Sequence, residues 1–152
     1  MRSSTSSHAA SRAQTRQKVT GAAAVEFTLV FPLLLLVVFG VVEFGIALYD
    51  KAVITNASRE AARAGIVLRQ TPLTGSQIQA VATSYCQNKL VTFGTATNCS
   101  VPTPTPCPSA SSAGTPLKVE VDYTFNGLVL GPLFAPFTGP LAINAVTTML
   151  CE

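Results

Sequence analysis

Residues 22–49 read AAAVEFTLVFPLLLLVVFGVVEFGIALY, and this stretch decides the fold. It is longer than the ~20 apolar residues that a helix needs to cross a bilayer core. It also exceeds the short apolar core of a cleaved secretory signal peptide, and Ile46-Ala47-Leu48 is a poor cleavage site. We therefore predict a transmembrane helix over residues 22–49. A kink is expected near Pro32, because proline removes a backbone donor from the helix.

Charge is distributed unevenly along the chain. Four of its ten Lys and Arg side chains precede Gly21 without any acid, and the other six accompany all seven Asp and Glu side chains. Cytoplasmic flanks of membrane helices are rich in Lys and Arg, so the N-terminus is predicted to be cytoplasmic and the C-terminal part extracytoplasmic. Residues 1–21 form a basic leader, whose first 20 residues resemble a disordered tail. No basic helix with interleaved aromatic residues is present, which argues against nucleic-acid binding.

The helix is predicted to continue beyond the membrane over residues 50–65. Small and apolar side chains recur there at three- and four-residue spacings, as one face of a helix requires. These side chains include Val53, Ala57, Ala61 and Ala64. Gly65 is expected to end the helix.

Residues 66–152 are predicted to form a small α+β domain with a few antiparallel strands, so the fold class is α+β. LKVEVDYTF, residues 117–125, alternates apolar and polar side chains and predicts a half-buried strand with Leu117, Val119, Val121 and Tyr123 inward. The remaining expected elements are a helix over 75–89 capped by Thr74 or Ser76, a short strand within 90–101, a Pro/Ser-rich loop over 101–116 and a last strand over 142–150.

Four cysteines, Cys86, Cys99, Cys107 and Cys151, all follow the apolar stretch. An even number on one side of a membrane span favours disulfides in an oxidising compartment over free buried thiols. Three pairings are possible, and we favour Cys86 with Cys99, which closes a short loop, leaving Cys107 for Cys151. No metal site is expected, because there is no C-x-x-C pair and the single His lies in the leader.

The start of the apolar stretch carries an unusual carboxylate, Glu26. A charge inside a membrane helix is costly and needs a partner. If the chain is cut after Gly21, the new α-amino group of Ala22 lies one helical turn from Glu26, and the helix N-terminus also favours the anion. Alternatively, Glu26 lies at the headgroup level, hydrated or paired with Lys18.

Residues 19–65 resemble the TadE-like pseudopilins of the Tad (Flp) type IV pilus system. The matching residues are Gly21, Glu26 and Phe27 at the junction, Pro32, Glu43 and Gly45 of an E-x-G element, and Ala61, Ala62 and Arg63. The resemblance implies a protein of the bacterial inner membrane, cut by a prepilin peptidase between Gly21 and Ala22. It also implies that the protein is a minor pilin-like component that acts in assembly of the pili. The implied partners are inner-membrane Tad platform proteins, membrane lipid, and other pilins or pseudopilins that pack on the N-terminal helix.

Other positions allow more than one interpretation. Gly40 and Gly45 are flexible or closely packed points for helix packing. Glu43 marks the outer end of the span, pairs with Lys51 or an arginine, or contacts another subunit. Arg59 and Arg63 form a solvated face or an interaction surface.

No enzyme is expected, because there is no nucleophile–base pair and no Gly-rich phosphate loop, and no cofactor is predicted. The alternative function is an uncleaved anchor presenting a periplasmic binding domain unrelated to pili. A secreted enzyme released by signal cleavage is a third hypothesis.

Overall fold

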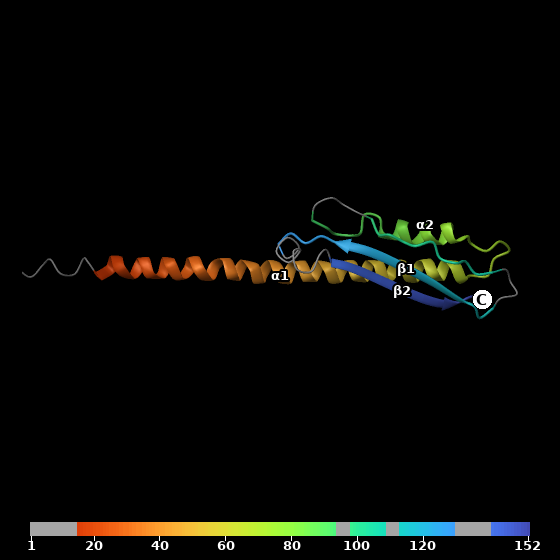
Figure 1. Ribbon diagram of the computed structural model, residues 1–152, viewed down its shortest axis with the longest axis horizontal. Helices are drawn as coiled ribbons and strands as arrows, with labels where there is room; N and C mark the ends of the chain where they lie inside the picture. The colour runs from red at the N-terminus through yellow and green to blue at the C-terminus, as the bar shows by residue number, and fades with distance from the viewer. Residues whose placement is uncertain (1–14, 94–97, 109–112, 130–140) are drawn as a thin grey trace, which may run out of the picture. The chain divides into compact units, whose positions relative to one another are not determined.

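The computed structural model describes residues 15–93, 98–108, 113–129 and 141–152. Its elements are helices α1 (Thr15–Ile66) and α2 (Gly75–Cys86) and strands β1 (Pro116–Phe125) and β2 (Leu141–Leu150), labelled in Figure 1. The chain forms two compact units, Met1–Phe39 and Gly40–Glu152, and α1 contributes to both. The predicted α+β class, with a long apolar N-terminal helix, is confirmed.

In the first unit, α1 begins at Thr15, earlier than the expected start at Ala22. The prediction of a disordered tail is therefore wrong for residues 15–20, while residues 1–14 lie outside the described part. Arg, Gln and Lys follow Thr15, and these residues favour helix, with no glycine or proline before Gly21. The helix is continuous through Pro32, and the kink there stays a prediction.

The second unit is built on one face of α1. Ile54, Ala57 and Ala61 are fully buried on this face. They pack in one core with α2 and the inner face of the sheet. The small alanine side chains bring the backbone of α1 close to its neighbours, so this half of the helix is a core element.

The sheet has two antiparallel strands, with Pro116 opposite Leu150 and Phe125 opposite Leu141. In β1 the predicted alternation is confirmed, since Leu117, Val119 and Val121 are buried and Lys118 is exposed. A single bridge, Ser100 with Asp122, is present where a short strand over 90–101 was expected.

Helix α2 starts with the predicted cap at Thr74, whose hydroxyl accepts a hydrogen bond from the N–H of Gln77. It ends at Cys86, three residues before the expected end at Lys89. The backbone leaves the helical conformation at Gln87, whose ψ is 127°, and Asn88 follows with a left-handed φ of 61°. Helix α1, in contrast, continues past the expected end at Gly65 to Ile66, so Gly65 lies inside the helix.

Candidate functional site

The predicted processing junction lies on the exposed surface of α1. Gly21, Ala22, Glu26 and Phe27 are all exposed. A side chain added at Gly21 would meet nothing within 4 Å. Among the described residues, Glu26 has no hydrogen bond or ion pair. The ring of Phe27 stacks on that of Phe31, with centroids 5.1 Å apart. The predicted junction is therefore exposed and helical.

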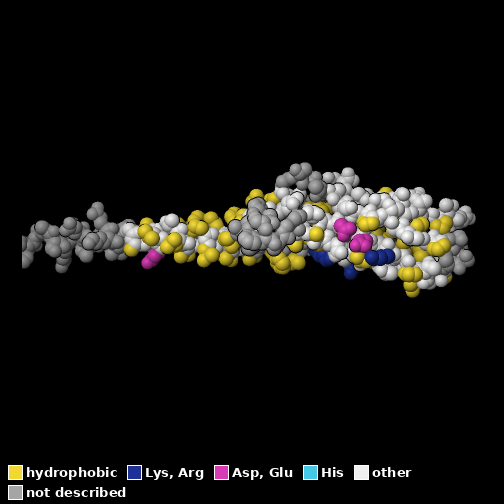
Figure 2. All heavy atoms as spheres, in the orientation of Figure 1, with side chains coloured by type: hydrophobic (Ala, Val, Ile, Leu, Met, Phe, Trp, Pro, Cys, Tyr) yellow, Lys and Arg dark blue, Asp and Glu magenta, His cyan; other side chains and the backbone are white. Residues whose placement is uncertain are grey.

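All side chains over residues 21–39 are exposed, although nearly all are apolar. Figure 2 shows hydrophobic side chains along this part of α1. Within the described chain, one helix segment, Gly21–Ile66, is long and apolar enough to span a membrane. So large an apolar surface, left uncovered by the described residues, needs lipid or other helices around it.

Glu43 is an anchor within the second unit. It is only 3% exposed, and its Oε1 accepts a hydrogen bond from the backbone N–H of Val129. Lys51, one partner considered for it, instead donates from Nζ to the carbonyl oxygen of Asn144. A buried carboxylate that satisfies a backbone donor holds the segment before residue 130 against α1.

Asp50 is a second buried acid on the same face of α1, two helical turns after Glu43. It is fully buried, and its Oδ1 accepts a hydrogen bond of 2.9 Å from the N–H of Val91. No residue in the described part of the chain gives its Oδ2 a hydrogen-bond partner. Burial raises the pKa of Asp50 from its ordinary value, and the Val91 hydrogen bond opposes this only in part. Sequence analysis did not single out Asp50; the seven-residue spacing from Glu43 places both acids on one face and was the available signal.

The remaining assembly candidates lie on different parts of α1. Gly45 is exposed, and a Cβ added there would meet nothing within 4 Å. It therefore makes no close contact with the rest of the described chain. Gly40 is half-buried, and Arg63 is exposed. The structure therefore does not bring Pro32, Gly40, Gly45 and Arg63 together into one site.

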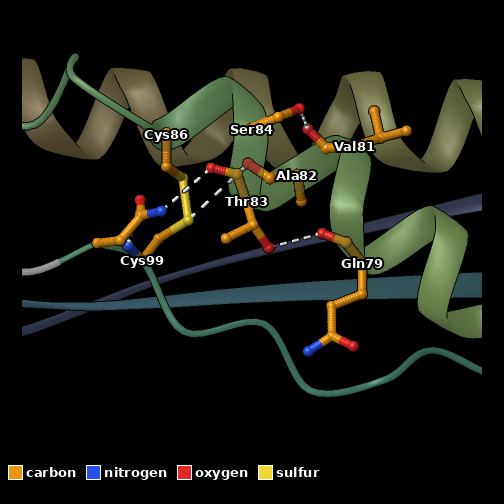
Figure 3. The surroundings of a disulfide bond; sticks show 8 residues. Gln79, Val81, Ala82, Thr83, Ser84, Cys86 and Cys99 are labelled. Atoms are coloured by element: carbon orange, nitrogen blue, oxygen red, sulfur yellow. Dashed lines mark hydrogen bonds between the residues drawn. A yellow bond between two sulfur atoms is a disulfide. The ribbon is translucent and has the colours of Figure 1, made fainter.

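Two disulfides close the second unit, with the favoured pairing. Cys86 bonds Cys99 and Cys107 bonds Cys151, with Cα atoms 6.0 and 5.9 Å apart. Figure 3 shows the first bond at the end of α2, where hydrogen bonds to backbone carbonyls surround it. One of these bonds joins the amide of Asn98 to the carbonyl of Thr83 at 3.3 Å. The loop after α2 is therefore held to the helix by covalent and polar links.

In the part of the chain that the structure describes, no three His, Cys, Asp or Glu side chains are grouped so that they could hold a metal ion.

Comparison with known proteins adds one finding. Residues 21–63 match the family model described as TadE-like protein, which confirms the resemblance over this segment. The match begins at the junction glycine and ends at Arg63. No curated protein matches the chain, and no solved structure does.

Proposed function

Because residues 21–63 form a TadE-like segment, we propose that this chain is a pilin-like component acting in assembly of Tad (Flp) type IV pili. TadE-like proteins are associated with Tad pilus assembly. The observation that carries the proposal is the division of α1. Its first part exposes an apolar surface over residues 21–39, and its second part is the core of a disulfide-bonded unit. Such a helix can pack in lipid or among other apolar helices while it presents a folded domain.

The proposed location is the bacterial inner membrane, crossed once, with the N-terminus cytoplasmic. The basic residues before Gly21 support this orientation. The two disulfides support an oxidising, extracytoplasmic location for the second unit. The proposed partners are a prepilin peptidase, the inner-membrane Tad platform and other pilins or pseudopilins.

Cleavage between Gly21 and Ala22 is the chemical event we propose for maturation. Gly21 has no side chain and weakens the helix by about 1 kcal/mol relative to alanine, which favours local unwinding. The amine freed on Ala22 is then one turn from Glu26, where it can neutralise the carboxylate in its own helix or in a neighbouring one. The exposure of Glu26 is compatible with either arrangement.

Intact-mass measurement of the membrane-extracted protein tests this proposal. In cells with the peptidase, the mass should correspond to a chain starting at Ala22, and Gly21→Ala should leave the leader attached. Gly45→Ala is the matched control, because an added methyl group at either glycine meets nothing within 4 Å. Retention of residues 1–21 in the unaltered protein would overturn the proposal of processing.

The alternative, an uncleaved anchor with a binding domain, is favoured by one observation, the continuity of α1 across the Gly21–Ala22 bond. It predicts that the leader is retained in all variants and that Glu26→Ala changes nothing. Isolation of the chain with pilin or platform subunits through its N-terminal helix would decide against it.

A further inference from the structure

The outer edge of β2 has free backbone groups. Ser100 and Asp122 exchange two backbone hydrogen bonds of 2.8 Å, so Asp122 directs its N–H and C=O away from β2. Asn144, which lies opposite Asp122, must then direct its own N–H and C=O outward, because such pairs alternate along an antiparallel ladder. Val146 and Thr148 follow the same alternation. Among the described residues, only the carbonyl of Asn144 has a partner on this edge, the Nζ of Lys51.

This edge lacks the features that usually protect an exposed strand. The sequence of β2, LAINAVTTML, contains no charged residue and no proline over ten positions. Charges, prolines and bulges normally block pairing with another chain. β1 has such protection, since Lys118, Glu120 and Asp122 occupy its corresponding positions and Ser100 covers part of its edge.

Lys51 of α1 reaches this edge, and two further exposed cations follow it along the same helix. Ser58 bonds Thr147 through their hydroxyl groups at 2.7 Å, and Lys51 bonds Asn144, so β2 runs along α1 in the same direction, as Figure 1 shows. Arg59 follows Ser58 on the side away from the core, and Arg63 lies one turn further; both are exposed. Among the described residues neither arginine makes an ion pair.

A second copy of the chain does not complement this edge. It would bring the same cations, Lys51, Arg59 and Arg63, to its own β2, and like charges facing each other across an interface disfavour association. The described edge of β1 is charged and partly covered by Ser100. A strand that carries acidic side chains is the complementary occupant.

We propose that the outer edge of β2 binds an extended strand of a partner protein, which carries acidic side chains toward Lys51, Arg59 and Arg63. The partner strand pairs with β2 through backbone hydrogen bonds to Val146 and Thr148, and the three cations favour acidic side chains on that strand. This surface goes beyond the proposed pilus role and does not depend on cleavage at Gly21. A single added strand is a small interface, so binding in the cell relies on a partner held at the same membrane.

The test uses the full chain, disulfides intact, in detergent and a fluorescent ten-residue peptide that alternates Thr and Glu. Binding is measured by anisotropy against two control peptides, one alternating Thr and Lys and one N-methylated at four central residues. Each control should bind about tenfold more weakly or worse, because it loses charge complementarity or backbone donors. Equal binding of the Glu and Lys peptides, no effect of N-methylation, or no binding of the Glu peptide would overturn the proposal.

Protein variants locate the binding. Val146→Pro removes an outward N–H that no described residue accepts, and it should weaken peptide binding about tenfold. Val146→Thr keeps this N–H and should bind the peptide normally. Replacing Arg59 and Arg63 by Gln should weaken binding of the Glu peptide and reduce the salt dependence of that binding. Glu60→Gln, at an exposed position of the same helix, is the control and should not weaken binding. If the proline variant misfolds, the N-methylated peptide still decides. A photo-crosslinking residue at position 146 that joins two copies of the chain would overturn the assignment to a different protein.

Discussion

Replacing Glu43 with alanine tests whether this carboxylate holds the second unit together. The change removes the acceptor of the Val129 N–H at a site that is 3% exposed. Losing a hydrogen bond to a charged group costs about 1.5–3 kcal/mol. For a unit of this size, roughly 4 °C of Tm corresponds to 1 kcal/mol. We therefore expect Glu43→Ala to lower Tm by roughly 6–12 °C.

Glu43→Gln refines this prediction. The amide oxygen can still accept from Val129, but the charge is lost, and charge-assisted hydrogen bonds are roughly twice as strong as neutral ones. We expect about half of the destabilisation of the alanine variant. Glu60→Ala, at an exposed position of the same helix, should leave Tm unchanged.

The assay is thermal unfolding followed by circular dichroism, on the full chain in detergent with both disulfides intact. An alanine variant as stable as the unaltered protein would refute the anchoring role. If that variant also lost its association with pilin-like partners, Glu43 would be an assembly residue, as one of the sequence interpretations holds. A glutamine variant as unstable as alanine would refute the argument from the retained acceptor.

Three further predictions concern the second unit. Because burial raises the pKa of Asp50 above its ordinary 3.8, the folded protein keeps this proton to a higher pH than the unfolded chain does. The free energy of unfolding therefore falls as pH rises from 3.8 through the folded-state pKa. Asp50→Asn should remove this loss, and parallel Tm–pH curves for the variant and the unaltered protein would contradict the prediction. Thr74→Ala should cost about 1 kcal/mol in denaturant unfolding, while Thr74→Ser keeps the cap. Gly65→Ala places a methyl group 2.6 Å from Cδ2 of Leu117 and 2.9 Å from Cδ1 of Ile78, so it should lower Tm. Its combination with Ile78→Val, which removes the second contact, should lower Tm by less than the sum of the two changes.

Local patterns predicted much of this fold from the sequence. The apolar stretch over 22–49 is long enough to predict a helix that can span a membrane, and strict alternation located β1 with its inward residues. The end of α2 was harder to predict, because the chain turns at Gln87 and Asn88, and composition does not indicate their backbone conformations. Of the three possible disulfide pairings, the one favoured for its short loop between Cys86 and Cys99 is the one observed.

The roles of the acids on α1 were harder to predict. The sequence marks Glu43 as unusual in an apolar region, but its hydrogen bond joins it to Val129, 86 residues away along the chain. Asp50 bonds Val91 across 41 residues. Such contacts depend on tertiary packing, and periodicity reports only local structure. The seven-residue spacing of the two acids showed a shared face without showing what each one holds.

Helix α2 is fixed at both ends, by the reciprocal bonds of Thr74 and Gln77 at its start and by the disulfide of Cys86 at its end. A twelve-residue helix would be marginal in isolation and would fray from its termini. Here fraying is blocked from both directions, so amide exchange in α2 requires opening of the larger unit. A protease would accordingly find no frayed end in this helix, and reduction of the Cys86–Cys99 disulfide would create one.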